Sequence, residues 1–371
     1  MNPRLAIWTI TPGGFLLGGR IALELRDAEL FVGAGIETAG RACRRFHRLS
    51  DALEAAFTQY PAHLFIMAAG IVVRAIAPFL GDKTRDPAVV VMDERGLHVV
   101  SLLSGHVGGA NRLARELARR FGAEPVITTA TDLNGLPAID ELAVRKGLRI
   151  ANPGAIRNVS MALLKGQTVW LHDPYGVFEH ELPEFVRVDA RPPGTACGFE
   201  PAEHGAGVVV DDIRFDLPPE ILLLRPGSLV AGMGCNRNTG ADEMAALLDA
   251  TLETHGLAKE SIAAIATVDI KADEPGLLEL GARLNVPVLF FTREELETVQ
   301  GVVSASAAVR HHIGVGSVCE AAAILGAKSG KLVVTKQKTP SATLALARKP
   351  STSSASVPAA FSTFRSGPGT S

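Results

Sequence analysis

The sequence predicts an α/β fold with two three-layer α/β domains, each built on a mostly parallel sheet, joined by a small middle module. In the amino-terminal part, short apolar runs typical of buried strands alternate with stretches of helical period. The same alternation returns from Ser228, and a proline-rich stretch without long periodic helices separates the two parts. We therefore expect domains at 1–145, 146–226 and 227–348 and a disordered tail at 349–371.

The length and composition indicate a folded, multi-domain protein. A chain of 371 residues exceeds what one hydrophobic core usually holds. With 37 Lys and Arg against 39 Asp and Glu, it has no bulk positive field for nucleic acid or an acidic membrane. Neither a signal peptide nor an apolar run of membrane-spanning length is recognisable, so a cytoplasmic location is expected. The four cysteines are scattered without metal-ligand spacing, which argues against a protein-bound metal.

The first domain is expected to contain a strand at 5–10, a glycine-rich turn and a helix through Ile21, followed by four further strands. Ligands collect at the carboxyl ends of parallel strands. The runs at 69–74, 104–111 and 128–132 each follow a strand candidate, and we expect them to share one edge of the sheet. The further strands are predicted at 63–68, 88–92, 99–103 and 125–130.

The last domain is expected to begin with a strand at 229–231 that leads into a second glycine-containing turn at 232–237. Gly232-x-Gly234 invites a dinucleotide-binding interpretation, but Arg237 stands where that fingerprint needs its third glycine. Pro275 suits the first position of a helix. Further strands are predicted at 262–267, 286–291 and 331–334.

The most informative run is 101–111, Ser-Leu-Leu-Ser-Gly-His-Val-Gly-Gly-Ala-Asn. A glycine-rich turn between a strand and a helix offers backbone N–H groups to an anion. His106 lies within this turn, and its side chain titrates near neutrality, which suits proton transfer. The alternative is an ordinary strand-to-helix turn with a surface histidine.

Other polar residues have a structural as well as a functional interpretation. Asp132 either orients His106 or caps the next helical turn. Arg74 and Lys83 either hold carboxylates or belong to a solvated loop. Lys271 and Glu274 follow a strand of the last domain, whereas Glu320 is explained more simply by the favourable dipole of a helix start.

Taken together, these motifs resemble the cobalt-precorrin-5A hydrolase family of cobalamin biosynthesis. Residues 67–74, 101–111 and 128–132 resemble its amino-terminal domain. Residues 232–237 and 314–322, with Asp269-Ile-Lys271 and Glu274, resemble its carboxy-terminal domain, which is shared with the pathway protein CobE. The resemblance covers residues 1–348 and leaves out the Ser/Thr/Pro-rich tail.

The resemblance implies that water opens the δ-lactone of a cobalt corrinoid precursor and that acetaldehyde leaves, giving cobalt-precorrin-5B. It implies no cofactor, because cobalt arrives within the substrate. It also implies transient contacts with other enzymes of the pathway. His106 is then expected to be the general base, aided by Asp132 and by the amides of Gly105 and Val107 to Gly109. The expected catalytic residues are His106, Asp132 and Glu274. The expected substrate-binding residues are Arg74, Lys83, Ser104, Gly105, Gly108, Gly109, Asn111, Gly234, Cys235, Asn236, Lys271 and Glu320.

Two other functions remain open on the sequence. A carrier that holds a corrinoid intermediate without catalysis would explain why no compact acid–base set is recognisable. An α/β enzyme for another polycarboxylate would explain the anion-binding turns alone.

If the protein is a hydrolase of this family, we expect both turns to frame one cleft between the α/β domains.

Overall fold

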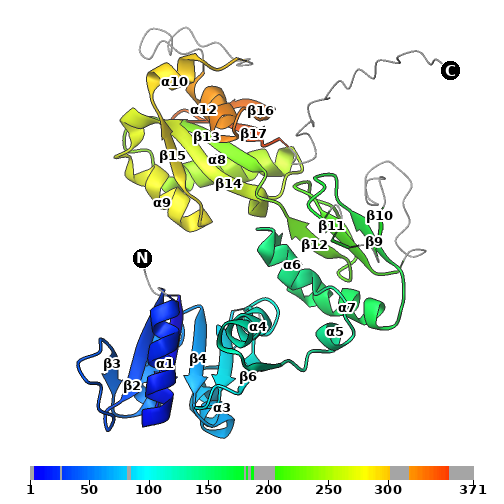
Figure 1. Ribbon diagram of the computed structural model, residues 1–371. Coiled ribbons are helices and arrows are strands. Elements are labelled where there is room, and N and C mark those ends of the chain that lie inside the picture. Colours follow the sequence, from blue (N-terminus) through cyan, green and yellow to red (C-terminus); the bar gives the residue numbers. More distant parts are fainter. Residues whose placement is uncertain are drawn as a thin grey trace, which may run out of the picture. The chain divides into compact units, whose positions relative to one another are not determined.

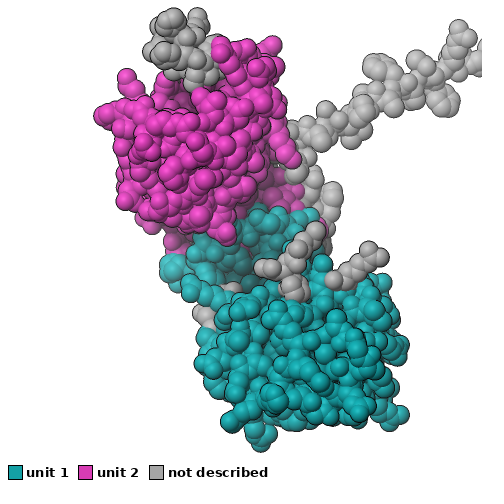
Figure 2. All heavy atoms as spheres, turned by 90° about the vertical axis from the view of Figure 1, so that its left-hand side faces the viewer, with its two compact units in different colours: residues 1–169, 219–222 teal, residues 170–218, 223–371 magenta. Residues whose placement is uncertain are grey.

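The computed structural model describes residues 4–25, 27–81, 85–178, 181–182, 185–187, 205–300 and 317–350. The chain forms two compact units, residues 1–169 with 219–222 and residues 170–218 with 223–371 (Figure 2). Lys83 and the predicted tail beyond Pro350 lie outside the described residues.

A seven-stranded sheet forms the core of the first unit (Figure 1). Its order is β3-β2-β1-β4-β5-β6-β7. The strands are β1 (Leu5–Thr9), β2 (Ala28–Gly33), β3 (Arg44–Phe46), β4 (Ala62–Ile66), β5 (Ala88–Met92), β6 (His98–Leu103) and β7 (Glu124–Val126). Neighbouring strands are parallel except β5 and β6, which are antiparallel. This one reversal decides which loops share an edge of the sheet.

Helices cover both faces of this sheet, which confirms the predicted three-layer arrangement. Apolar side chains of α1 (Pro12–Glu24) and α4 (Ala110–Phe121) pack on one face. Those of α2 (Leu49–Ala56) and α3 (Ala69–Ile76), which continues into η1 (Ala77–Phe79), pack on the other. The prediction of a glycine-rich turn after β1 is wrong, because its glycines at 13–14 and 18–19 lie within α1. The helix begins at Pro12, and Thr11 caps it by accepting a hydrogen bond from the Gly14 amide.

The middle of the chain has a sheet of its own, of order β10-β9-β11-β12-β8. The structure corrects one prediction about the residues before this sheet and adds strands to the proline-rich stretch itself. The strand expected at 125–130 is shorter, because β7 ends at Val126 and a helical turn begins at Ala130. The proline-rich stretch, expected without long helices, does contain short strands. Its elements are α5 (Ala130–Leu133), α6 (Ile139–Arg145), β8 (Arg149–Ile150), η2 (Pro153–Ala155), α7 (Ile156–Leu164), β9 (Val169–His172), β10 (Phe185–Arg187), β11 (Gly207–Val210) and β12 (Leu222–Arg225).

The carboxy-terminal part is a second three-layer domain with sheet order β15-β14-β13-β17-β16. The strands β13 (Leu229–Cys235), β14 (Ile262–Val268) and β15 (Val288–Phe291) are parallel. A hairpin of β16 (Lys331–Lys338) and β17 (Ala342–Arg348) adds antiparallel strands. Helices α8 (Ala241–Thr254) and α9 (Pro275–Leu284) cover one face, while α10 (Arg293–Glu297) and α12 (Val318–Gly326) cover the other. Short 3-10 turns lie at η4 (Lys259–Ser261) and η5 (Asp269–Lys271).

Candidate functional site

The turn between β6 and α4 is held together by its own backbone. The amide of Gly109 donates to the carbonyl of His106 at 2.9 Å, and the amides of Ala110 and Asn111 donate to the carbonyls of Ser104 and Gly105. The Gly109 amide is therefore already used. Of the predicted anion donors, the amides of Gly105, Val107 and Gly108 have no assigned acceptor among the described residues.

His106 is held between two carboxylates. Its Nε2 lies 3.0 Å from Asp132 Oδ2, and its Nδ1 lies 3.5 Å from Asp140 Oδ1. The hydrogen bond to Asp140 is the largest influence on the imidazole. Together with the charge of Asp140 and the contact with Asp132, it outweighs burial and raises the pKa of His106 to about 9. His106 is therefore an imidazolium at neutral pH, which is at odds with the predicted role of general base in the free protein.

Asp132 is fixed by several donors. Asn111 Nδ2 donates to its Oδ2 at 2.9 Å, and Arg115 and Thr129 donate to it as well. Burial opposes the ionised form, but the hydrogen bonds from Thr129, Arg115 and His106 prevail and hold the pKa of Asp132 at about 2. Asp132 thus stabilises and orients the imidazolium, and Asn111, itself buried, supports Asp132.

A cavity of about 300 Å³ opens beside His106 within the first unit. Ser104 lines the cavity on a backbone held at φ 56°, and its hydroxyl oxygen is buried without a hydrogen-bond partner among the described residues. Such strained positions are often found at functional sites. The lining residues are Ser104, Gly105, His106, Val107, Thr129, Asp140, Ile156, Arg157 and Ser160.

Three polar cavity residues outside the sequence motifs, Asp140, Arg157 and Ser160, were not predicted from the sequence. Asp140 stands in the first turn of α6, where an acidic residue is commonplace, and the other two lie on α7 in the stretch without a recognisable motif. No local pattern distinguishes them. Only the folding of α6 and α7 beside the turn that carries His106 brings them to this cavity.

The prediction that Arg74 shares an edge with His106 is wrong. Arg74 lies in α3, after the carboxyl end of β4, and its guanidinium donates to the Gly70 carbonyl. Because β6 runs antiparallel to β5, the turn after β6 lies at the opposite edge, among the amino ends of the parallel strands. Accordingly, Gly108 and Gly109 line a separate cavity of about 530 Å³ together with Leu5, at the start of β1.

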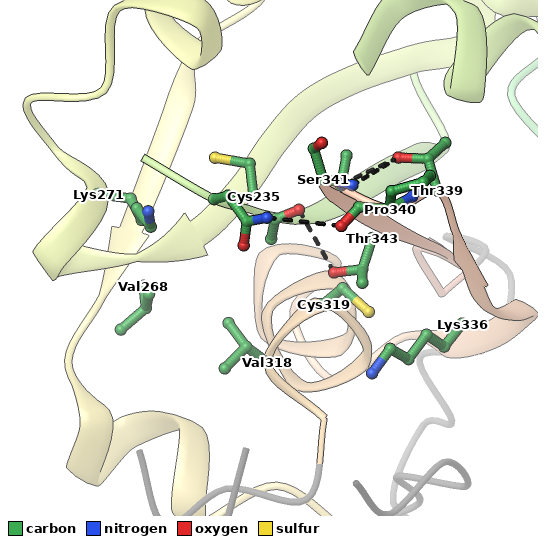
Figure 3. Close-up of a pocket in the computed structure, with 13 residues that line it drawn as sticks. Cys235, Val268, Lys271, Val318, Cys319, Lys336, Thr339, Pro340, Ser341 and Thr343 are labelled. Carbon is green, nitrogen blue, oxygen red and sulfur yellow. Dashed lines mark hydrogen bonds between the residues drawn. The ribbon is translucent and has the colours of Figure 1, made fainter. Parts of the chain in front are cut away.

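A second candidate pocket, of about 320 Å³, lies in the carboxy-terminal domain (Figure 3). Gly234, Cys235, Asn236 and Lys271, all predicted to bind substrate, line it. In Figure 3, Lys271 and Lys336 enter from opposite sides of the pocket. Burial raises the pKa of the Cys235 thiol, so this side chain is protonated at neutral pH. The remaining lining residues are Val268, Val318, Cys319, Thr339, Pro340, Ser341, Ala342 and Thr343.

Glu274 and Glu320 are buried and do not line this pocket. Glu274 accepts a hydrogen bond from the Asn238 amide at 2.6 Å and lies 3.6 Å from the amino group of Lys271. It therefore positions Lys271. Glu320 lies in the first turn of α12 and accepts from the Lys336 amide at 2.9 Å, in keeping with its structural interpretation.

Within the part of the chain that the structure describes, no helix has the length and apolar character needed to span a membrane. Among the same residues, no three His, Cys, Asp or Glu side chains come together in a way that could hold a metal ion. The predicted cleft between the α/β domains remains a prediction, since each pocket described above lies within one unit.

Three family models match consecutive parts of the chain. They are described as Cobalamin synthesis G N-terminal (51–132), Cobalamin biosynthesis central region (137–226) and Cobalamin synthesis G C-terminus (229–347).

Curated relatives agree with these matches. The cobalt-precorrin-5A hydrolase of Salmonella typhimurium is 39% identical over 86% of this chain and 91% of its own. That of Priestia megaterium is 33% identical over 80% of this chain and 81% of its own. Protein CobE of a Sinorhizobium species is 35% identical over 32% of this chain and 79% of its own. Matched along most of its length by relatives of one kind, the chain belongs to the cobalt-precorrin-5A hydrolase family.

Proposed function

We propose that the protein hydrolyses the δ-lactone of cobalt-precorrin-5A in anaerobic cobalamin biosynthesis. The observation that carries this proposal is His106, held between Asp132 and Asp140 at the wall of a cavity. Opening a lactone with water needs a group that accepts a proton and a group that stabilises negative charge on oxygen. The cavity supplies candidates for both.

In this proposal Asp140 accepts the proton of the attacking water, and His106 stabilises the oxygen that becomes negative. Asp140 lies on the Nδ1 side of the imidazole and lines the cavity. Asp132, on the Nε2 side, is saturated by other donors and has a pKa too low to accept a proton readily. The amides of Gly105 and Val107, which have no assigned acceptor among the described residues, are further donors for the lactone carbonyl oxygen.

Hydrolysis adds one water molecule across the acyl C–O bond and yields a carboxylic acid and an alcohol. When the alcohol loses its proton, the neighbouring C–C bond breaks and the two-carbon unit leaves as acetaldehyde. The electron pair of that bond returns to the macrocycle, which takes up a proton. The sequence of steps needs neither an oxidant nor a reductant, so we propose no cofactor beyond the cobalt that the substrate carries.

The carboxy-terminal pocket is proposed to bind a carboxylate side chain of the same substrate. Lys271 and Lys336 supply two positive charges there, and Val268 and Val318 supply apolar walls. We further propose that the protein works in the cytoplasm and passes its product on through transient contacts with other enzymes of the pathway.

The carrier alternative was motivated by the absence of a recognisable acid–base set. Asp132, His106 and Asp140 now form such a set, which removes that motive. The experiment that separates enzyme from carrier is incubation of the protein with cobalt-precorrin-5A while released acetaldehyde is trapped. Acetaldehyde above the protein-free control is expected, and corrinoid binding without acetaldehyde would favour the carrier.

A further inference from the structure

Arg157 is an exposed cation on the wall of the His106 cavity without an ion-pair partner among the described residues. By contrast, the nearby Arg115 is paired with Asp132. Three further observations indicate that this cavity binds an anion.

The position of Arg157 in its helix is electrostatically unfavourable. It is the second residue of α7, and the first turn of this helix contains no acidic residue. The positive end of the helix dipole favours anions, so a cation at this place weakens the helix. Helix stability therefore does not explain Arg157, whereas an anion bound in the cavity would compensate for it.

Ser104 supplies another observation. Its hydroxyl oxygen is buried, has no hydrogen-bond partner among the described residues and belongs to a residue of this cavity. Leaving a buried hydroxyl unpaired is costly, and a rotation of this side chain toward the cavity would let it donate to a bound ligand. The Ser160 hydroxyl, one turn along α7 from Arg157, lines the same wall.

The charges around the cavity also favour an anion. The charged residues of the lining are His106 and Arg157, both positive, and Asp140, which is negative. Asp132, on the far side of the imidazole, is balanced by Arg115. An additional negative group would therefore restore neutrality.

We propose that Arg157, with the Ser104 hydroxyl, forms a carboxylate-binding subsite that receives the carboxylate released when the lactone opens. This inference rests on the proposed function. The lactone is a neutral ester at its acyl carbon. Once water has added and the C–O bond has broken, that carbon bears a carboxylic acid, which loses its proton to become a carboxylate. Arg157 would thus bind the reacting group most strongly after the bond has broken, which favours the forward reaction.

The test compares Arg157→Met with Arg119→Met, a matched control that removes another exposed arginine of the same unit, on α4. Two stable cobalt corrinoids serve as ligands, one with free acetate and propionate groups and one with the same groups as amides. We expect Arg157→Met to weaken binding of the free acid about 10- to 100-fold and to leave binding of the amide unchanged. Arg157→Lys should retain part of the affinity, and Arg119→Met all of it.

A second measurement uses the lactone substrate. Arg157→Met should lower kcat about 10- to 100-fold with little change in KM, because the carboxylate does not exist in the bound lactone. Its melting temperature should stay the same or rise, since the substitution removes a cation from the start of α7. Wild-type affinity of Arg157→Met for the free acid, or equal losses for acid and amide, would overturn the proposal.

The two proposals can fail separately. If the wild-type protein releases no acetaldehyde from the lactone, the proposed function fails. The acid and amide corrinoids still report on carboxylate recognition by Arg157, because that measurement involves no turnover.

Discussion

The protonation state of His106 decides which chemical role its side chain can take. The sequence indicates a proton-transfer residue, and the Asp132 contact that we expected is present. The second carboxylate, Asp140, was not foreseen, and it raises the pKa of His106 the most. A histidine between two carboxylates keeps its proton and stabilises negative charge, so the role of base moves to Asp140.

This assignment predicts a definite pH dependence. If the imidazolium is the active form, kcat should stay level from neutral pH and fall as the pH rises through about 9. If neutral His106 were the base, kcat would instead rise over the same range. A pH–rate profile for acetaldehyde release, measured where chemistry limits the rate, distinguishes the two.

Asp140→Asn supplies the control for that profile. It removes the carboxylate that contributes most to the raised pKa of His106, so the alkaline limb should move to lower pH. It also removes the proposed base, so kcat should fall about 10²- to 10⁴-fold. Glu141→Gln, at the next position of α6, should leave both kcat and the alkaline limb of the pH–rate profile unchanged. An unmoved limb in Asp140→Asn would contradict the electrostatic account.

Lys271 and Lys336 lend themselves to a similar comparison in the carboxy-terminal pocket. Replacing either by Met should weaken binding of a free-acid corrinoid about tenfold or more, because a charge-assisted contact is lost. Lys331→Met, on the same strand as Lys336 but outside the pocket, is the matched control. If titration calorimetry gave the three variants the same affinity for the free-acid corrinoid, neither lysine would be a carboxylate-binding residue.

At the scale of elements, periodicity predicted the strands β1, β4, β5, β6, β14 and β15, since it reports local burial. It missed β2, β3 and β17, and it placed a turn at 232–237 where β13 continues to Cys235. A local sequence pattern does not predict whether a strand runs parallel or antiparallel to its neighbour. We expected the runs after β4 and β6 to share an edge, but the β5–β6 reversal separates them and removes Arg74 from the site. The middle stretch was hard to interpret because its strands are short and separated by prolines.

Gly232 shows how a functional pattern can have a packing cause. A Cβ atom at this position would lie 1.9 Å from the Cys319 carbonyl oxygen and 2.6 Å from the Ala323 nitrogen. Gly232 therefore lets β13 approach α12, so the first glycine of the Gly-x-Gly pair has a packing cause and needs no dinucleotide.

Gly232→Ala should accordingly destabilise the protein by about 1–3 kcal/mol or more, because backbone must move to relieve the clash. Gly240→Ala, where a Cβ would meet nothing within 4 Å, should have little effect. Urea denaturation of both variants tests this, and equal stability of Gly232→Ala and the wild type would refute the packing explanation.

At the scale of the whole molecule, buried charges connect distant parts of the chain within the second unit. Asp212, fully buried, accepts two hydrogen bonds from Arg348 of β17, both at 2.7 Å. It also accepts from Tyr175 at 2.5 Å and from Ser228 at 2.6 Å. One carboxylate thus joins the region after β11 to the residue before β13 and to the last strand, β17, of the carboxy-terminal domain.

Removing this carboxylate should be costly. Asp212→Ala leaves a partly buried arginine without its partner, and such losses typically cost about 3–5 kcal/mol. Asp216→Ala, an exposed neighbour, serves as the control and should change stability little. A free energy of unfolding for Asp212→Ala within about 1 kcal/mol of the wild type would show that the cluster contributes little to stability.

The most direct test of the central claim is a single-turnover measurement of acetaldehyde release from cobalt-precorrin-5A by the wild type and by His106→Ala. The account predicts one acetaldehyde per lactone opened by the wild type. For His106→Ala it predicts a rate about 10²- to 10⁴-fold lower with corrinoid binding retained. A wild type that releases no acetaldehyde, or a His106→Ala rate within about threefold of the wild type, would contradict it.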